Sequence, residues 1–179
     1  ANSIIRFSVI TGNTTEDNNG TIYIDQGNVV IENNTINQNS ARNGGGIYSY
    51  DSNTTIRSNV IAGNSIADAG GGIRTQQGIV LIERNTIKQN VAHHSAGLHI
   101  YAGTVTINQN VISQNNVNLS QGHGAGIQIH EVKRGSTFNH NQLVQNAGKE
   151  VIYTSTANIS MNGNNTTYHL NAKFRSNLQ

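Results

Sequence analysis

Aromatic and cationic side chains recur in strand-like segments of the sequence, at intervals of about 25 residues. Tyrosine and histidine rings can stack on a sugar, and arginine can pair with the carboxylate of an acidic sugar. Histidines near their ordinary pKa would also make binding depend on pH between about 6 and 7. The candidate glycan-binding residues are Tyr48, Tyr50, Arg74, His99, Tyr101 and His130. The alternative is that tyrosine simply favours exposed strand positions.

Carboxylates that could cleave a glycosidic bond are scarce on the same segments. A glycoside hydrolase needs two of them roughly 5–10 Å apart, but here Asp25 stands alone and Glu131 follows the last strand. A calcium-assisted lyase needs several acidic ligands together, and the sequence does not offer them. We therefore predict no catalytic residues. A metal-free polysaccharide lyase stays open as an alternative, with Tyr101 or His130 as the base and Arg74 neutralising a uronate.

Two histidines could hold a metal ion. His94 and His123 occupy the same position of two successive repeats. Asp68 belongs to the repeat that precedes that of His94, and lies one position earlier within its repeat. Two imidazoles and a carboxylate can bind a divalent cation, whereas the alternative is a pair of solvated loop histidines. Phosphate-binding loops and His-Glu-x-x-His motifs are absent from the sequence. We predict no metal and no other cofactor, and keep these three residues as weak metal candidates.

Composition excludes several classes of protein. The chain has 179 residues, the size of one domain, with 35% hydrophobic and 11% charged residues. It has no cysteine, which excludes disulfides, a thiolate zinc site and a thiol nucleophile. The net charge is only +2 and the basic residues are scattered, so no nucleic-acid partner is predicted. No apolar run approaches the ~20 residues of a membrane helix, so no membrane insertion is predicted.

A repeat of about 25 residues organises the whole chain. Its clearest marker is an apolar residue followed three positions later by asparagine, as in Ile36–Asn39 and Ile87–Asn90. A Gly-Ile or Gly-Leu pair follows at a fixed distance, as in Gly72-Ile73. A second asparagine precedes each apolar marker by two residues. These asparagines are Asn34, Asn59, Asn85, Asn110 and Asn141.

Each repeat holds three short runs with the two-residue alternation of β-strands and no helical apolar stripe. Stacked repeats would align the inward residues in ladders. The ladder expected from the third run of each repeat has two files of residues. They are Ile22, Ile47, Ile73, Leu98, Ile127 and Val151, and Ser49, Thr75, Ile100, Ile129 and Tyr153. The second asparagine of each repeat would form an internal ladder at a tight turn, because buried amides must be paired.

These patterns predict an all-β fold, a right-handed parallel β-helix (β-solenoid) of about seven coils with three short strands per coil. The expected organisation is a single domain over residues 1–179. Its coils are expected near residues 1–28, 29–53, 54–78, 79–103, 104–135 and 136–158, with a last partial coil and possible cap at 159–179. Residues 116–122 and 132–134 lengthen one coil, and such loops are an alternative place for a site.

The repeats resemble the right-handed parallel β-helix proteins of the pectin-lyase-like class, over about residues 3–166. Gly45-Gly46-Ile47 with Ile87–Asn90 also resembles the repeats of chlamydial polymorphic outer-membrane proteins and related bacterial surface passengers. The resemblance implies an internal asparagine ladder and a site on the outer face of the strand after the long turn. It also implies an extracellular or cell-surface location. Function does not follow from this scaffold, which hosts lyases, hydrolases, epimerases, tailspikes and adhesins.

Three functions are therefore compatible with the sequence. The first is a glycan-binding or adhesive surface protein, possibly part of a longer rod, whose partner is a polysaccharide or surface glycan. The second is a polysaccharide-degrading, lyase-type enzyme domain. The third is a structural solenoid that stacks end to end as a homo-oligomer, because the first coil shows no obvious cap and open strand edges pair readily.

Overall fold

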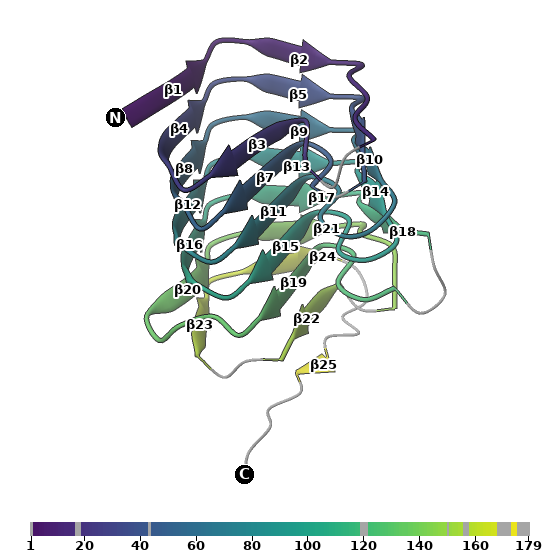
Figure 1. Ribbon diagram of the computed structural model, residues 1–179. Coiled ribbons are helices and arrows are strands. Elements are labelled where there is room, and N and C mark those ends of the chain that lie inside the picture. The colour runs from purple at the N-terminus through teal and green to yellow at the C-terminus, as the bar shows by residue number, and fades with distance from the viewer. Residues whose placement is uncertain are drawn as a thin grey trace.

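The computed structural model describes residues 2–16, 19–42, 44–118, 122–149, 151–155, 158–167 and 173–174; of these, residues 165–167 and 173–174 are described by their backbone alone. Every regular element in the described residues is a β-strand, and all strand pairs are parallel. No helix in this part of the chain is long and apolar enough to cross a membrane. The predicted all-β parallel solenoid is confirmed, and Figure 1 shows its coils stacked from the purple end to the green one.

Four parallel sheets run along the stack. The chain passes through them in the order A, B, C and D, except that the described residues of the coils at the two ends contribute no strand to sheet C. Sheet A contains β1 (Asn2–Arg6), β4 (Asn28–Glu32), β8 (Asn53–Arg57), β12 (Ile79–Glu83), β16 (Thr104–Asn108), β20 (Ser136–Asn139) and β23 (Ile159–Asn162). Sheet B contains β2 (Val9–Thr11), β5 (Thr35–Asn37), β9 (Val60–Ala62), β13 (Thr86–Lys88), β17 (Val111–Ser113), β21 (Gln142–Val144) and β24 (Asn165–Thr167).

Sheet C is short and sheet D lies nearest the viewer in Figure 1. Sheet C contains β6 (Ser40–Ala41), β10 (Ser65–Ile66), β14 (Val91–Ala92) and β18 (Asn116–Val117). Sheet D contains β3 (Ile22–Asp25), β7 (Ile47–Tyr50), β11 (Ile73–Gln76), β15 (Leu98–Tyr101), β19 (Ile127–His130), β22 (Ile152–Thr154) and β25 (Lys173–Phe174).

Two details differ from the sequence prediction. Sheets A, B and D have seven strands each. The six intervals between neighbouring strands of one sheet correspond to about six full turns, where about seven coils were predicted. In the part of the chain that the structure describes, four of the coils have a fourth strand, in sheet C, where a turn was expected. Two-residue strands are too short to show alternation in a sequence. Of the predicted cap, residues 168–172 and 175–179 lie outside the described part, whereas β23 and β24 simply continue sheets A and B.

The chain turns from sheet A to sheet B through one residue in the left-handed region. From the second coil on, that residue precedes a ladder asparagine, as Ser58 (φ 55°) precedes Asn59 and Arg84 (φ 54°) precedes Asn85. In the first coil Phe7 (φ 52°) precedes Ser8 instead. A non-glycine residue in this conformation costs roughly 1–2 kcal/mol. The turns from sheet B to sheet C repeat the arrangement, as Gln89 (φ 55°) does before Asn90. These costs recur along the stack and must be offset at the corners themselves.

Asparagine ladders supply that offset. The Oδ1 of Asn59 accepts the backbone N–H of Asn34 at 2.9 Å and its side-chain amide at 3.0 Å. In turn the Asn59 amide donates to the Ile31 carbonyl at 2.9 Å and to Asn85 Oδ1 at 3.0 Å. Asn59 is only 1% exposed, so these bonds form away from water, where leaving the groups unpaired would be costly. The predicted ladder is present and extends to Asn164.

A second ladder stands at the corner between sheets B and C. Its members are Asn13, Asn39, Asn64, Asn90, Asn115 and Asn146, linked by the same pair of bonds to each Oδ1. The sequence analysis used these asparagines only as markers of the repeat. The structure shows that the marker exists because each asparagine closes a corner and ties it to the next coil.

Close packing requires the glycine that directly precedes strands of sheet D such as β7 and β11. A Cβ on Gly72 would lie 2.7 Å from the Gly97 carbonyl of the next coil and 2.8 Å from Ile87 Cγ2. Gly46 meets the same two constraints from Gly72 and Ile61. The Gly-Ile marker of the repeat is therefore a steric requirement of coils that stack at the ~4.8 Å spacing of parallel strands.

Isoleucine ladders fill the interior. Ile31, Ile56, Ile82 and Ile107 are completely buried and continue into Phe138. Stacked β-branched side chains of this kind pack well on one another in sheets.

In the last coil, the predicted register of sheet D is wrong by one residue. Ile152 and Thr154 point inward, and Tyr153 pairs with Gln128 on the outer face. Because alternation has period two, a slip of one residue exchanges the two faces of a strand. The irregular length of the preceding coil hid this register in the sequence.

The ladder can be tested with Asn85→Leu. The substitution removes the acceptor for the backbone and side-chain amides of Asn59 and the donor to the Ile56 carbonyl. We expect the free energy of unfolding to fall by about 1–3 kcal/mol, which lowers the melting temperature by several degrees. Asn116→Leu, at an exposed position of β18, is the control and should change stability by less than about 0.5 kcal/mol. Equal melting temperatures for both variants would contradict the ladder's contribution.

Candidate functional site

The outer face of sheet D carries all six predicted glycan-binding residues. They lie in two files that follow the pairing of neighbouring strands. The first file is Tyr23, Tyr48, Arg74, His99, Gln128 and Tyr153, and the second is Asp25, Tyr50, Gln76, Tyr101 and His130. Alternation places these side chains outward because their neighbours, such as Ile73 and Thr75, are completely buried. The stack thus brings together residues that are separated by about a repeat in the sequence.

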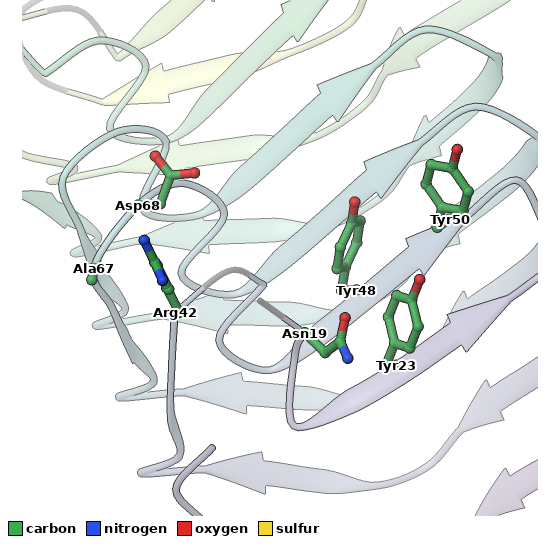
Figure 2. A pocket seen from close by; sticks show the side chains of 7 residues that line it. All are labelled: Asn19, Tyr23, Arg42, Tyr48, Tyr50, Ala67 and Asp68. Atoms are coloured by element: carbon green, nitrogen blue, oxygen red, sulfur yellow. The ribbon is translucent and has the colours of Figure 1, made fainter. Parts of the chain in front are cut away.

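A hollow of about 680 Å³ lies at one end of this face, within the usual size range of small-ligand sites. Figure 2 shows the three tyrosine rings standing side by side on sheet D, with Asn19 beside them and Arg42 and Asp68 across from them. The residues that line the hollow are Asn19, Tyr23, Arg42, Tyr48, Tyr50, Ala67 and Asp68. Rings on one side and an amide, a guanidinium and a carboxylate around them suit a ligand that has apolar faces and many hydroxyls.

Tyr48 supports the hollow more than it lines it. Its ring is 9% exposed and is held between Tyr23, with centroids 5.3 Å apart, and Arg74, whose Cζ lies 5.1 Å from the ring centre. The Tyr48 hydroxyl donates to Gln76 Oε1 at 2.9 Å. Tyr23 is 40% exposed, so Tyr23 rather than Tyr48 presents a ring face to a ligand.

Burial is the main cause of raised pKa values for Tyr23 and Tyr48. For Tyr23 the negative charge of Asp25 adds to the effect, whereas for Tyr48 the charge of Arg74 opposes it. Both hydroxyls therefore stay protonated at neutral pH and remain hydrogen-bond donors.

A second group of rings gathers around His130 further along the face. The His130 ring centre lies 5.4 Å from that of Tyr153, 6.0 Å from that of His99 and 6.4 Å from that of Tyr101. His130 Nε2 is 2.6 Å from Gln128 Nε2, and Nδ1 is 2.8 Å from the Ser155 hydroxyl. Both ring nitrogens are thus engaged. The side-chain Oε1 of Gln128 also accepts a hydrogen bond from the Ser95 hydroxyl. This bond fixes the group in one arrangement.

Burial lowers the pKa of both predicted histidines. Burial, reinforced by the charge of Arg74, lowers the pKa of His99 to about 3. Burial also lowers the pKa of His130, although the charge of Glu131 opposes the shift. The expected pH dependence between about 6 and 7 is therefore wrong for His99, because this side chain is already neutral above pH 5.

The metal candidates are adjacent in register, but two of them, His123 and Asp68, have other partners. Ala69 forms a parallel β-bridge with His94, and the Ser95 N–H donates to the backbone carbonyl of His123. The two histidines therefore occupy aligned positions of neighbouring coils. The His123 ring packs on Tyr153 with centroids 5.0 Å apart, and Asp68 Oδ2 lies 3.4 Å from Arg74 Nη1. In the described part of the chain, no three His, Asp or Glu side chains come together as a metal site would require.

Loops supply the part of the hollow that sequence reasoning missed. Asn19 and Arg42 come from the segments that lead into sheet D in the first two coils. Arg42 shares the repeat position of Asp68, whereas nothing in its local sequence marks Asn19. Tyr23 did carry a signal, because it shares the repeat position of Tyr48. Of the long loops considered earlier, residues 119–121 lie outside the described part, and in the other loop Val132 is buried.

The family model of the right-handed β-helix region matches residues 3–166. The chain belongs to the right-handed β-helix family. The match covers the residues over which the resemblance was predicted, and the predicted family is confirmed. Comparisons with curated proteins and with solved structures found no significant match. Right-handed β-helix proteins share a scaffold and not one activity, so the function of this member rests on its site.

The buried histidine predicts an acid-sensitive contribution to stability. The His99 pKa lies below its unfolded value. The unfolded state therefore binds a proton that the folded state excludes between about pH 6.5 and 3. His99 contributes its full stability above about pH 6.5 and loses it as the pH falls. We expect the melting temperature of His99→Gln to fall less between pH 7 and pH 4 than that of the unsubstituted protein.

A matched control uses the exposed His140, which occupies the turn position of Gln109 in the coil before. His140→Gln should reproduce the pH dependence of the unsubstituted protein. If His99→Gln and His140→Gln follow the same curve from pH 7 to pH 4, His99 has an ordinary pKa and the argument from burial is wrong.

Proposed function

We propose that the outer face of sheet D binds a glycan, and that the protein is an extracellular or cell-surface glycan-binding β-helix. The observation that supports this most directly is the hollow beside Tyr23, Tyr48 and Tyr50. Stacked rings and a rim of hydrogen-bonding side chains are the usual means of holding a sugar, whose ring faces are apolar and whose edges carry hydroxyls. The polysaccharide or surface glycan is then the partner that the aromatic and cationic residues of this face predicted.

The charges around the hollow favour a sugar rich in hydroxyls over a strongly acidic one. Arg74, the predicted partner of a carboxylate, is 3.4 Å from Asp68 and lies against the Tyr48 ring. Arg42 brings the other guanidinium to the hollow, and Asp68 brings a carboxylate. A site with both signs of charge can accept and donate hydrogen bonds, but it repels an anionic chain as much as it attracts one.

The side chains that a lyase would use as a base are poorly suited to that work. A hydrogen bond to Glu131, followed by the charge of the same residue, raises the pKa of Tyr101, and a base needs a pKa near the working pH. His130 has both ring nitrogens engaged with neighbours. These features favour binding without turnover.

The proposal can be tested by screening the purified protein on a glycan array and measuring the affinity of each variant for the best ligand. Tyr23→Ala removes the exposed ring and should weaken binding about tenfold, since a stacked ring contributes on the order of 1 kcal/mol beyond its buried area. Tyr23→Phe keeps the ring and should bind within about twofold. Lys88→Ala, on the outer face of sheet B, is the control for an unrelated surface.

Full affinity in Tyr23→Ala would place the glycan elsewhere on the molecule and overturn the proposal for this hollow. An assay for unsaturated products from uronic polysaccharides runs alongside the binding measurement. We expect no turnover, and steady product formation would replace glycan binding with the lyase alternative.

A further inference from the structure

We propose that the outer face of sheet A is the contact surface of an antiparallel, side-by-side dimer of this chain. The proposal is independent of the glycan site, which lies on sheet D. It rests on a pattern of charge in one outward file of sheet A and on exposed apolar side chains beside that file.

The file consists of Arg6, Glu32, Arg57 and Glu83, one residue from each of the first four coils. Strand pairing aligns Arg6 with Glu32, Glu32 with Arg57, and Arg57 with Glu83. The next member, Asn108, is uncharged. The charges therefore alternate in sign over four coils, at the ~4.8 Å spacing of neighbouring strands, and the pattern then stops.

A file with an even number of residues of alternating charge is complementary in charge to the same file read in the opposite direction. Consider a two-fold axis that runs parallel to the strands, between β4 and β8. This axis places a second copy face to face with the first. Each file then lies opposite the same file of the other copy, with the order of the coils reversed. Arg6 then faces Glu83 of the other copy, and Glu32 faces Arg57, so every charge meets its opposite. An interface of this isologous kind is the commonest arrangement of homodimers, and charge complementarity of this kind selects one register and suppresses others.

Apolar side chains occupy the same face. Ile4 and Ile79 are 57% and 64% exposed, which is unusual for isoleucine in a protein whose other isoleucines are mostly buried. The file that contains Ile4 continues through Val30, Thr55 and Leu81, and in the dimer Ile4 faces Leu81. Two sheets that pack face to face lie about 10 Å apart, a distance that these side chains and the longer Arg and Glu side chains fill from both sides.

Stacking within one chain accounts for only part of the charge pattern. Arg57 Nη2 lies 2.7 Å from Glu32 Oε2; the Glu32 side chain is 14% exposed and the Arg57 side chain is still 47% exposed. An exposed pair of this kind adds little to stability by itself. Ile4 lies in the first coil, which has a neighbouring coil on one side only, whereas Ile79 is exposed between two coils. In the dimer Ile79 faces Asn2 of the other copy, so the interface covers both isoleucines together with the charged file.

The size of the face sets the strength that we expect. Four short strands present much less than the roughly 800 Å² per partner of a standard interface, so the dissociation constant should be micromolar and should rise with salt. Sedimentation velocity of the purified protein, from about 5 to about 500 µM, covers this range. A single species of monomer mass at every concentration would overturn the proposal.

Charge variants give the sharper test. Glu32→Arg with Glu83→Arg makes the file entirely positive, and Arg6→Glu with Arg57→Glu makes it entirely negative. Each double variant should be monomeric alone, and an equimolar mixture of the two should form a heterodimer. Glu32→Arg with Arg57→Glu exchanges the two central charges, keeps every facing pair opposite in sign, and should dimerise like the unsubstituted protein. Circular dichroism and melting temperature confirm that each variant is folded.

The apolar contribution is tested with Ile79→Ser, which should weaken dimerisation at least tenfold. Val60→Ser is the matched control, because Val60 is 39% exposed on the outer face of sheet B. Self-association that is unchanged in all charge variants, or that grows beyond a dimer with concentration, would overturn the proposal in favour of end-to-end stacking.

Discussion

The hydrogen bond from each ladder asparagine to the next coil is the interaction on which the rest of this structure depends. Its Oδ1 accepts both the backbone N–H and the side-chain amide of the preceding ladder asparagine, as Asn85 does for Asn59. One side chain therefore satisfies the corner of one coil and links it to another. Without this bond, each corner would combine a strained left-handed residue with unpaired buried amides, and both are unfavourable.

Two such ladders make a rigid frame, and the frame explains why the faces are regular. When both ends of the sheet B strand are tied to the next coil, successive coils cannot shift relative to one another. The outward side chains then form straight files, and the same physical arrangement produces the aromatic file of sheet D and the charged file of sheet A. Function in such a scaffold is a matter of which residues occupy the files, because the positions themselves are set by the core.

The aromatic face shows how packing divides residues of one type into different roles. Tyr48 and Tyr23 occupy neighbouring positions of the same file, but Arg74 and Gln76 hold Tyr48 in place while Tyr23 stays open to solvent. His99 likewise lies in the file, and its burial removes it from the titration range of an ordinary histidine. Rigid support beneath an exposed ring lowers the entropy lost when a ligand binds.

The coil, the family and most of the interior of this protein could be predicted from the amino-acid sequence alone. A repeat of about 25 residues and alternation with period two are local signals, and in a parallel stack the neighbours of a residue are its equivalents in the adjacent repeats. For this reason the inward isoleucines, the Asn34 to Asn141 ladder and the two files of sheet D could be predicted.

The tertiary structure decided what depends on contacts between unlike positions. The loops before sheet D bring Asn19, Arg42 and Asp68 to the tyrosines of the hollow. The irregular fifth coil sets the register of Tyr153, and the strands of sheet C are too short to leave a pattern. The exposure of Tyr23, the cover over Tyr48 and the low pKa of His99 also belong here. Burial and charge at one side chain depend on its different neighbours in three coils, and a repeat pattern records only what those coils have in common.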